Sequence, residues 1–553
     1  MPVVNLDLNR LGKWFPGMSV QQLIEALPFI ALDIESISDS EIRIEYNPNR
    51  PDFSSDYGIA RALRGYLGIE IGAPKINLVR TNRYKILIDD PNKLPRPFIS
   101  GLVVRDLELD TQAIKQLSSI QDDLHEGIAR HKIKASIGIY PLNDIKFPLR
   151  YTSLSNDFTF TFVKKSSATR VADLMKDDMV SKNRQLQRNF CNRYSALLDN
   201  ENKLISIPPL ASYGAATLES GKTDLFIQVT SVDRKLADDM IAILAALVYD
   251  MGSKLKTIVI ETPRTIAYSP NLALSHILVT ADLVNGTLGT KLSSEEIITS
   301  LGKCRLDAKA IKKNRSTIRC TIPRYRVDIF DKIDIVEEVA IGYGIKNLIP
   351  SIPSSNESGN LNKVSHYFDV IRVTMLGLGF LEVNNFSLID KKIQFDFMGD
   401  KFEPDKSLTV EGAQNSELDI LRNSLMPSLM LNLSRNIHET YPQKIFEIAK
   451  VYNNEKNLEQ WHLAVLLAYS GANFTDAKSV LQGFLASSFA TGIITDPMTS
   501  SHFIDGRCAK VIIGSDRIGE LGEISSHAID CFKLRVPISG FELNLSKMLN
   551  IES

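Results

Sequence analysis

The stretch RYRVDIFDKIDIVEEVAIGYG, residues 324–344, places Asp328, Asp334, Glu337 and Glu338 within eleven residues. Its second half has the apolar spacing of an amphipathic helix, so residues 334, 337 and 338 share one face. Carboxylates repel one another at close range, so an ordered cluster usually shares a cation, and an all-oxygen set favours Mg²⁺ or Ca²⁺ over zinc. The alternative is a solvated acidic first turn.

The composition bounds the class of protein. A chain of 553 residues is too long for one core, and its 44% apolar and 23% charged residues are ordinary for a soluble globular protein. The net charge of −1 gives no global attraction to nucleic acid. The longest apolar run, residues 240–249, is half a membrane span, and the N-terminus lacks a signal-peptide core. We therefore expect a cytoplasmic protein without membrane contact.

The remaining composition excludes several chemistries. The five cysteines are scattered without zinc-ligand spacing, which is typical of buried thiols in a reducing compartment. The chain has no Walker loop, dinucleotide fingerprint or nucleophile elbow.

The chain predicts an α+β protein of four domains. NPNRPD (47–52) is a turn that leads into a helix capped by Ser54, Ser55 or Asp56, and Gly68 ends that helix. The module that holds the carboxylates also contains a helix–turn–helix pattern and a basic run, 309–319, which is either a solvated hairpin or a contact for tRNA phosphates. PSIPSSNESGN is the strongest linker. The domains are expected at 1–88, 98–265, 268–350 and, after the linker at 350–360, 361–553.

The stretch around the four carboxylates resembles the magnesium-coordinating module of the phenylalanyl-tRNA synthetase beta subunit. That family carries a Pro, an Arg, two Asp six residues apart and a Glu-Glu pair, which Pro323, Arg326 and the four acids match. NPNRPD and its helix resemble the family's N-terminal signature, and the third large domain resembles it as well. The length of the chain is similar to that of the archaeal or eukaryotic type of this subunit. The C-terminal matches are LRNSLMPSLMLNLSRN (421–436), KIFEIAKVY (444–452) and FIDGRCAKVIIGSDRIGELGEI (503–524).

The resemblance implies that residues 361–553 form an antiparallel class II synthetase-like domain without catalytic residues. Arg422, Arg435 and Arg507 are present, but their flanks do not resemble ATP-binding motifs. The ligation of L-phenylalanine to tRNA(Phe) with ATP is then expected on a separate alpha subunit, in a heterotetramer of two alpha and two beta chains. Mg²⁺ on the four carboxylates would stabilise the assembly near the subunit contact.

The resemblance places hydrolytic editing of Tyr-tRNA(Phe) in residues 98–265. A site built for an apolar ring excludes an extra hydroxyl only modestly, which is why a second pocket is needed. SIPPLAS (206–212) and TSVD (230–233) match the family's pocket segments. The candidate editing residues are Ser206, Ser212, Thr230 and Asp233.

Three departures from the family bear on editing. Ser212 stands for an Asn, Ser231 for a Gly, and residues 140–143 depart from a His-Asp-Leu-Asp pattern. A Ser hydroxyl is shorter than an Asn amide, and a Ser for Gly narrows the pocket wall. The sequence leaves open a subunit that edits, a structural subunit whose second domain is inactive, and a free-standing tRNA-binding paralogue.

Overall fold

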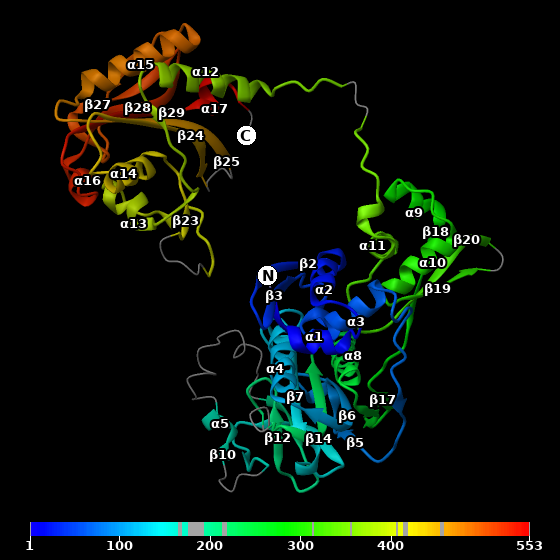
Figure 1. The fold of residues 1–553 in the computed structure, drawn as a ribbon. Coiled ribbons are helices and arrows are strands. Elements are labelled where there is room, and N and C mark those ends of the chain that lie inside the picture. The colour runs from blue at the N-terminus through cyan, green and yellow to red at the C-terminus, as the bar shows by residue number, and fades with distance from the viewer. Residues whose placement is uncertain are drawn as a thin grey trace. The chain divides into compact units, whose positions relative to one another are not determined.

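The computed structural model describes residues 2–163, 169–174, 193–212, 218–311, 314–353, 357–404, 407–412, 418–453 and 458–551. Contacts divide the chain into two compact units, residues 1–352 and 353–553 (Figure 1). The division falls inside the stretch 350–360. Among the described residues, no helix is long and apolar enough to cross a membrane.

The N-terminal module packs three helices on a small antiparallel sheet. Ser55 caps α3 by accepting a hydrogen bond from the Gly58 backbone N–H, and Gly68, at φ +76°, follows the helix end. A Cβ on Gly58 would lie 1.7 Å from the Asp52 carbonyl oxygen, so glycine lets the NPNRPD turn pack against its own helix. The sheet order is β1 (Val3–Asp7), β3 (Glu41–Tyr46), β2 (Leu32–Ile37), and the helices are α1 (Leu8–Trp14), α2 (Val20–Ala26) and α3 (Asp56–Tyr66).

The second domain has three layers: two helices, a five-stranded sheet and a seven-stranded sheet. The helices are α4 (Thr111–Glu126) and α8 (Arg234–Asp250). The five-stranded order is β4 (Leu78–Val79), β15 (Lys254–Lys256), β6 (Phe98–Leu109), β14 (Gly221–Ser231), β7 (Ala135–Pro141). The seven-stranded order is β13 (Ala211–Ser212), β12 (Leu204–Ile207), β11 (Arg193–Leu198), β8 (Leu149–Ser155), β5 (Lys85–Ile88), β16 (Ile258–Glu261), β17 (Ile266–Ser269). Beside it lie β9 (Thr159–Phe160), β10 (Thr169–Arg170) and α5 (Val171–Leu174).

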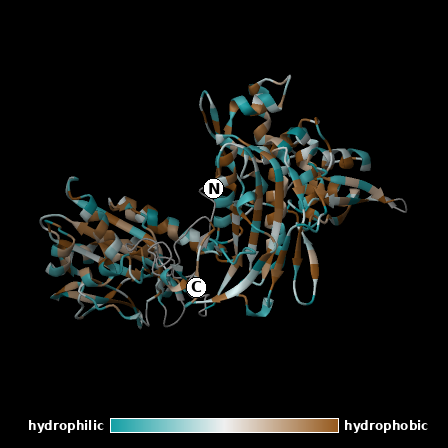
Figure 2. Cartoon of the chain, turned by 90° about the horizontal axis from the view of Figure 1, so that it is seen from below, coloured by the Kyte–Doolittle hydropathy of each residue, from teal (hydrophilic) through white to brown (hydrophobic). Residues whose placement is uncertain are grey.

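Strand alternation separates the two cores of this domain. Ile137, Ile139 and Ile227 pack toward α4 and α8, whereas Tyr140 and Phe226 face the seven-stranded sheet. Figure 2 shows hydrophobic residues running along these strands. β4 and β5 lie within the range 1–88 expected for the N-terminal domain, yet they pair with strands of this domain. β5 pairs in parallel with β8 and β16, and such long-range pairing leaves no local signal.

The third module joins a three-stranded sheet to three helices. Ser293 caps α10 through a capping box, and a Cβ on Gly342 would lie 2.0 Å from the Ser300 carbonyl oxygen, so α10 and α11 pack closely. The basic run 309–319 forms parts of β19 and β20, and its residues 312–313 lie outside the described ones. The sheet order is β18 (Ser275–Thr280), β20 (Asn314–Ile322), β19 (Asp307–Ile311), and the helices are α9 (Ala281–Leu288), α10 (Ser294–Lys303) and α11 (Lys332–Tyr343).

The C-terminal unit is a seven-stranded sheet covered on both faces. α12 (Lys363–Gly377), α15 (Phe474–Phe489) and α17 (Leu545–Met548) pack on one face, and α14 (Met426–Arg435) and α16 (Ser526–Cys531) on the other (Figure 1). All pairs are antiparallel except β21 with β24. The order is β21 (Leu381–Glu382), β24 (Gln443–Asn453), β25 (Leu458–Ala468), β29 (Ile538–Asn544), β28 (Asp516–Ile524), β27 (Phe503–Ile513), β26 (Ile494–Pro497); beside it lie β22 (Leu388–Ile389), β23 (Ile420–Leu421) and α13 (Lys391–Gln394).

Candidate functional site

A guanidinium lies between two of the four predicted metal ligands. Arg326, at 4% exposure, donates from Nε to Asp328 Oδ1 at 2.9 Å and from Nη2 to Asp328 Oδ2 at 2.7 Å. The same group donates from Nη1 to Glu338 Oε2 at 3.1 Å and from Nη2 to Glu338 Oε1. Burial alone would lower the pKa of Arg326, but the two carboxylates outweigh it and raise that pKa well above its ordinary value. Arg326 is therefore a cation that Asp328 and Glu338 share.

The NPNRPD turn supplies a second buried set of charges. Arg50 donates from Nε and Nη2 to the two oxygens of Asp52, each at 2.9 Å. Arg61, on α3, lies 3.6 Å from Asp52 Oδ2 through Nη2 and pairs with Asp250 through Nη1. Although burial by itself would raise the pKa of Asp52, the neighbouring arginines, Arg50 first, lower it to about 2.

The two sets meet and form one network. Arg50 Nε lies 4.0 Å from Asp328 Oδ2, and the Arg61 guanidinium lies 4.2 Å from the centre of the Tyr325 ring. The network joins the N-terminal turn, the end of α8 and the carboxylate module, which are far apart in the chain. We call this set the ionic junction: Arg50, Asp52, Arg61, Asp250, Arg326, Asp328 and Glu338.

The other two predicted ligands lie apart from Arg326. Asp334 Oδ2 accepts hydrogen bonds from the backbone N–H groups of Phe330 at 2.6 Å and Asp331 at 2.8 Å. The Glu337 side chain is largely exposed. The burial that remains, and then the nearby Glu338, Asp334 and Asp328 carboxylates, raise its pKa. Among the described residues, no three His, Cys, Asp or Glu side chains form a group that could hold a metal ion. In this arrangement Asp328 and Glu338 are paired with Arg326, and Asp334 accepts its hydrogen bonds from the backbone.

The candidate editing residues fall into two environments. Ser206 and Thr230 are buried at 1% and 0% exposure. Ser212 pairs through its backbone with Ser206, and its side chain lies outside the described ones. Asp233 is exposed and caps α8 by accepting from the Leu236 N–H at 3.2 Å. Ser231 is buried and donates to the Lys134 carbonyl oxygen at 3.0 Å.

Gln228 is a buried polar residue that the sequence reasoning missed. Its Nε2 donates to Tyr140 Oη at 3.2 Å and to Ser206 Oγ at 3.1 Å. We call Tyr140, Ser206 and Gln228 the inter-sheet cluster. The signal was available, since Gln228 interrupts the apolar run DLFIQVT of β14. Because alternate residues of a strand share a face, that interruption placed an amide beside Phe226 and Thr230.

The C-terminal unit uses its buried polar groups internally. Arg422, at 2% exposure, donates from Nη1 to Glu447 Oε1 at 2.8 Å. Glu542 accepts a hydrogen bond from Ser424 Oγ at 2.7 Å and lies 2.7 Å from His462 Nδ1. It also accepts a hydrogen bond from the backbone N–H of residue 425 at the start of α14. Arg435 is exposed, and the exposed Arg507 pairs with Glu523 at 2.6 Å. These three arginines therefore do not line a shared, positively charged pocket.

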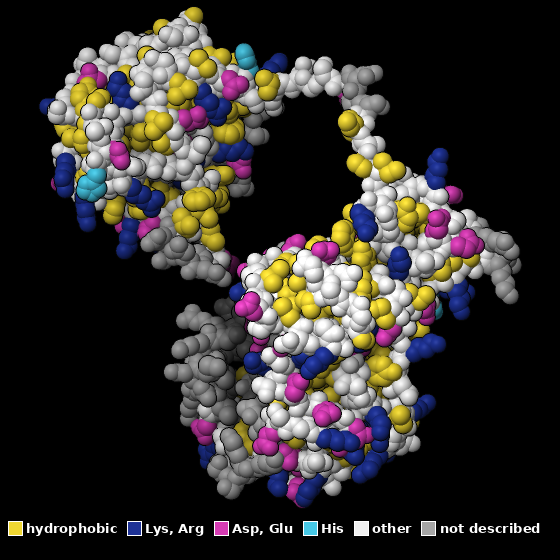
Figure 3. Space-filling view, viewed as in Figure 1, with side chains coloured by type: hydrophobic (Ala, Val, Ile, Leu, Met, Phe, Trp, Pro, Cys, Tyr) yellow, Lys and Arg dark blue, Asp and Glu magenta, His cyan; other side chains and the backbone are white. Residues whose placement is uncertain are grey.

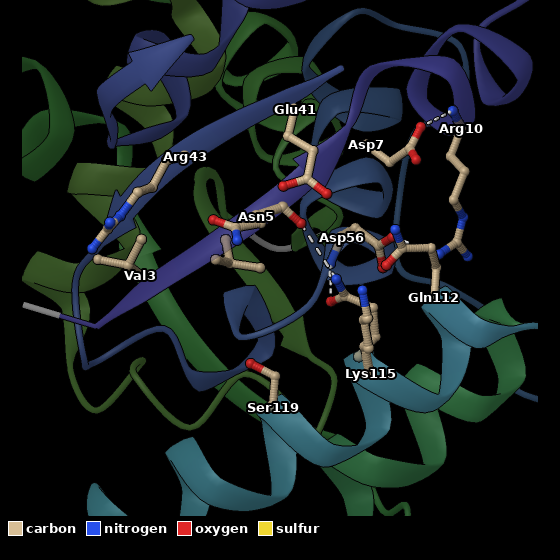
Figure 4. Close-up of a pocket in the computed structure, with 12 residues that line it drawn as sticks. Val3, Asn5, Asp7, Arg10, Glu41, Arg43, Asp56, Gln112, Lys115 and Ser119 are labelled. Atoms are coloured by element: carbon tan, nitrogen blue, oxygen red, sulfur yellow. Dashed lines mark hydrogen bonds and ion pairs between the residues drawn. The ribbon is translucent and has the colours of Figure 1, made fainter. Parts of the chain in front are cut away.

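A hollow of about 370 Å³ lies between β1, β3 and α4 (Figure 4). Arg10 pairs with Asp56 at 3.1 Å and donates to Tyr57 Oη at 2.6 Å. Burial raises the pKa of Asp56 to about 6, although Arg10 acts in the opposite direction. Charges of both signs line the hollow, and on the face of residues 1–352 seen in Figure 3 basic and acidic side chains are also interspersed.

Comparisons with known proteins give a consistent result. Residues 326–545 match the family described as the phenylalanyl tRNA synthetase beta chain CLM domain, and residues 277–345 match the tRNA synthetase B5 domain. The phenylalanine–tRNA ligase beta subunit of Archaeoglobus fulgidus is 34% identical over 99% of this chain and 98% of its own length. That of Methanosarcina barkeri is 31% identical, covering 99% of both chains.

A solved structure shares the fold of more than half of the chain. The crystal structure of an N-terminal fragment of the phenylalanyl-tRNA synthetase beta subunit from Pyrococcus horikoshii superposes with a TM-score of 0.57 at 21% identity. The superposition covers 62% of this chain and 99% of that one.

Proposed function

The chain belongs to the family of phenylalanine–tRNA ligase beta subunits, and on that premise we propose that it is the non-catalytic partner of an alpha subunit. The alpha subunit would join L-phenylalanine to tRNA(Phe) with ATP, in the cytoplasm, while this chain supports it and helps to place the tRNA. Two alpha and two beta chains form the proposed assembly.

The coverage of the C-terminal sheet carries this proposal. An adenylate-forming site needs an open pocket and cations free to meet the triphosphate. Here helices cover both faces of the sheet, Glu447 neutralises Arg422, and Glu542 is engaged with the start of α14. The unit thus has the character of a packed support.

Co-expression with the alpha subunit of the same organism tests this role. The complex should aminoacylate tRNA(Phe), and either chain alone should not. The chain alone should show no phenylalanine-dependent exchange of pyrophosphate into ATP. Sedimentation should give the mass of two alpha and two beta chains. Exchange activity in this chain alone, or full activity of alpha without it, would contradict the proposal.

We also propose that Mg²⁺ binds at the quartet of Asp328, Asp334, Glu337 and Glu338. The donor set is all oxygen, as Mg²⁺ prefers, and the charge of Arg326 offsets only one of four carboxylates. Mg²⁺ would offset two of the three remaining charges, with Asp334 and Glu337 as the carboxylates that do not pair with Arg326.

Thermal unfolding in the presence of Mg²⁺ tests the metal site. Millimolar Mg²⁺ should raise the melting temperature of the wild type, because a ligand that binds only the folded state stabilises it. Asp334→Ala with Glu337→Ala should abolish that rise and weaken assembly with alpha. Asp282→Ala with Glu295→Ala removes two acids from helix first turns of the same module and should leave the rise intact. A wild type that does not respond to Mg²⁺ would refute the site.

For tRNA placement we propose the hairpin of β19 and β20 as a phosphate contact. Its described basic residues include Lys309 and the exposed Arg319. Neutralising both should weaken tRNA(Phe) binding and reduce the slope of log affinity against log salt by roughly 1–2. An unchanged slope would indicate a merely solvated hairpin.

For the second domain we propose a retained fold without editing activity. Hydrolysis at Ser206, Ser212, Thr230 and Asp233 would need a pocket that opens to the tRNA end. Ser206 and Thr230 are instead buried between the sheets, and Asp233 serves as a helix cap. The assembled complex should leave Tyr-tRNA(Phe) as intact as Phe-tRNA(Phe), and selective loss of tyrosine would overturn this point.

A further inference from the structure

The inter-sheet cluster holds a phenol in a built environment. Tyr140 is completely buried, its ring lies 5.9 Å from that of Phe226 at 26°, and its hydroxyl accepts a hydrogen bond from Gln228. Ser206 Oγ accepts from the same amide nitrogen. An aromatic wall with an amide and a hydroxyl at its end is the chemistry that recognises a hydroxyphenyl group.

The backbone makes room for this ring. Gly138 lies two residues before Tyr140 on β7, so both face the seven-stranded sheet. A Cβ on Gly138 would lie 2.0 Å from Tyr140 Oη and 2.5 Å from its Cζ. The phenol therefore folds back over its own strand, in space that only glycine leaves open.

One polar atom of the cluster remains unused. Among the residues that the structure describes, Gln228 Oε1 is buried and has no hydrogen-bond partner. Such an acceptor is costly in a closed core, because burial removes its water without replacing the hydrogen bond. It is an acceptor suited to the O–H of a phenol, and Tyr140 fills the space in front of the amide.

We propose that Tyr140 is a resident phenol that fills a hydroxyphenyl-binding site between the two sheets, and that this plug keeps tyrosine out of the second domain. Only the source of the ligand, the tyrosyl group of Tyr-tRNA(Phe), rests on the proposed function. The recognition itself rests on Tyr140, Gln228, Ser206 and Phe226. Removing the Tyr140 ring should therefore create a cavity that prefers phenols to plain arenes.

The first experiment uses the full chain with Tyr140→Ala and two probes of the same shape, p-cresol and toluene. Ligand-observed NMR should show p-cresol bound to the variant about tenfold more tightly than toluene, the value of one buried hydrogen bond. The wild type should bind neither probe. Adding Gln228→Met to Tyr140→Ala should remove the preference. Equal binding of the two probes, or none by a folded variant, overturns the proposal.

A second variant covers the case in which Tyr140→Ala does not fold. Tyr140→Val introduces a β-branched residue, which suits a strand, and leaves a smaller cavity, which phenol and benzene probe in the same way. Tyr140→Phe keeps the ring and should stay closed to every probe. A Tyr140→Phe protein that binds p-cresol would show that the ring is not the plug.

Deacylation separates this inference from the proposed function. The wild type assembled with alpha should not hydrolyse Tyr-tRNA(Phe), and selective hydrolysis with Tyr140 in place would overturn the plug. If the complex fails to aminoacylate tRNA(Phe), the proposed function is refuted, but the p-cresol experiment still tests whether the cavity prefers phenols. If it aminoacylates and the Tyr140→Ala cavity shows no preference, only the resident phenol is refuted.

Discussion

The ionic junction and the inter-sheet cluster are both buried and polar, but they satisfy their groups in opposite ways. In the junction, every arginine named meets at least one carboxylate, from segments far apart in the chain. The inter-sheet cluster is neutral and leaves Gln228 Oε1 without a partner among the described residues. Buried charges demand partners, since an unpaired one costs several kcal/mol, roughly 3–5. A neutral amide tolerates an incomplete set of hydrogen bonds, which is why Gln228 Oε1 can stay unpartnered whereas a charge of the ionic junction cannot.

The chain offers a direct way to measure both regions. Its two tryptophans are Trp14 and Trp461, which lie in different units. Replacing Trp461 with Phe leaves Trp14 fluorescence as a reporter of the unfolding of residues 1–352. The following predictions are made in that background.

The largest effect is expected for Arg326→Ala, which leaves Asp328 and Glu338 buried without their shared cation. The free energy of unfolding should fall by about 3–5 kcal/mol in urea titrations. Arg319→Ala, an exposed change on β20, should stay within about 0.5 kcal/mol of wild type. A loss at Arg326 as small as that of the control would mean that the junction does not hold the modules together.

The ionic junction should also contribute to the loss of stability at acid pH. Asp52 has its pKa lowered from 3.8 to about 2 in the folded state. Its contribution is present above about pH 4 and lost as the pH falls through 2, and it amounts to about 2 kcal/mol. The inter-sheet cluster should contribute nothing there, because burial raises the pKa of Tyr140 to about 12.

Asp52→Asn tests this assignment through the pH dependence of unfolding. The variant should be less stable at pH 7 and should show a flatter decline between pH 4 and 2. Tyr140→Phe should keep the full decline of the wild type. If Asp52→Asn loses stability at acid pH as the wild type does, that loss arises from other carboxylates.

The neutral cluster should respond more weakly than the junction. Gln228→Met removes the donor to Tyr140 and Ser206 but also removes the unpartnered oxygen, so the net loss should be about 1 kcal/mol. Gln21→Met on the exposed face of α2 is the matched control and should change little. A loss at Gln228 equal to that of Arg326→Ala would erase the distinction between the two regions.

The smallest change in stability is expected for substitutions of Asp233, which caps α8. Asp233→Ala should cost about 1 kcal/mol or less by removing the cap of α8, and Asp233→Ser should restore stability because serine caps as well. Neither variant should change the fate of Tyr-tRNA(Phe). Deacylation that depends on Asp233 would return it to a hydrolytic role.

Prediction from the sequence succeeded where the signal is local. The cap at Ser55 and the glycine after α3 were readable, because capping depends on a few consecutive residues. The division between the two units falls in a stretch, 350–360, whose composition is typical of a linker. The pairing of β4 and β5 with the second domain was not, because strand pairing across long loops leaves no local trace.

The amino-acid sequence alone determined the family, the local elements and the carboxylate quartet, because spacing and chemistry are written along the chain. It named Arg326 as a motif residue and expected a metal ion as the cation that the acids share. Only the tertiary structure decided that Arg326 itself pairs with Asp328 and Glu338, beside the NPNRPD turn, and that Tyr140 stands before Gln228. The reason is physical: the energy of a buried charge or amide depends on partners within a few ångströms, and folding brings those partners from distant parts of the chain.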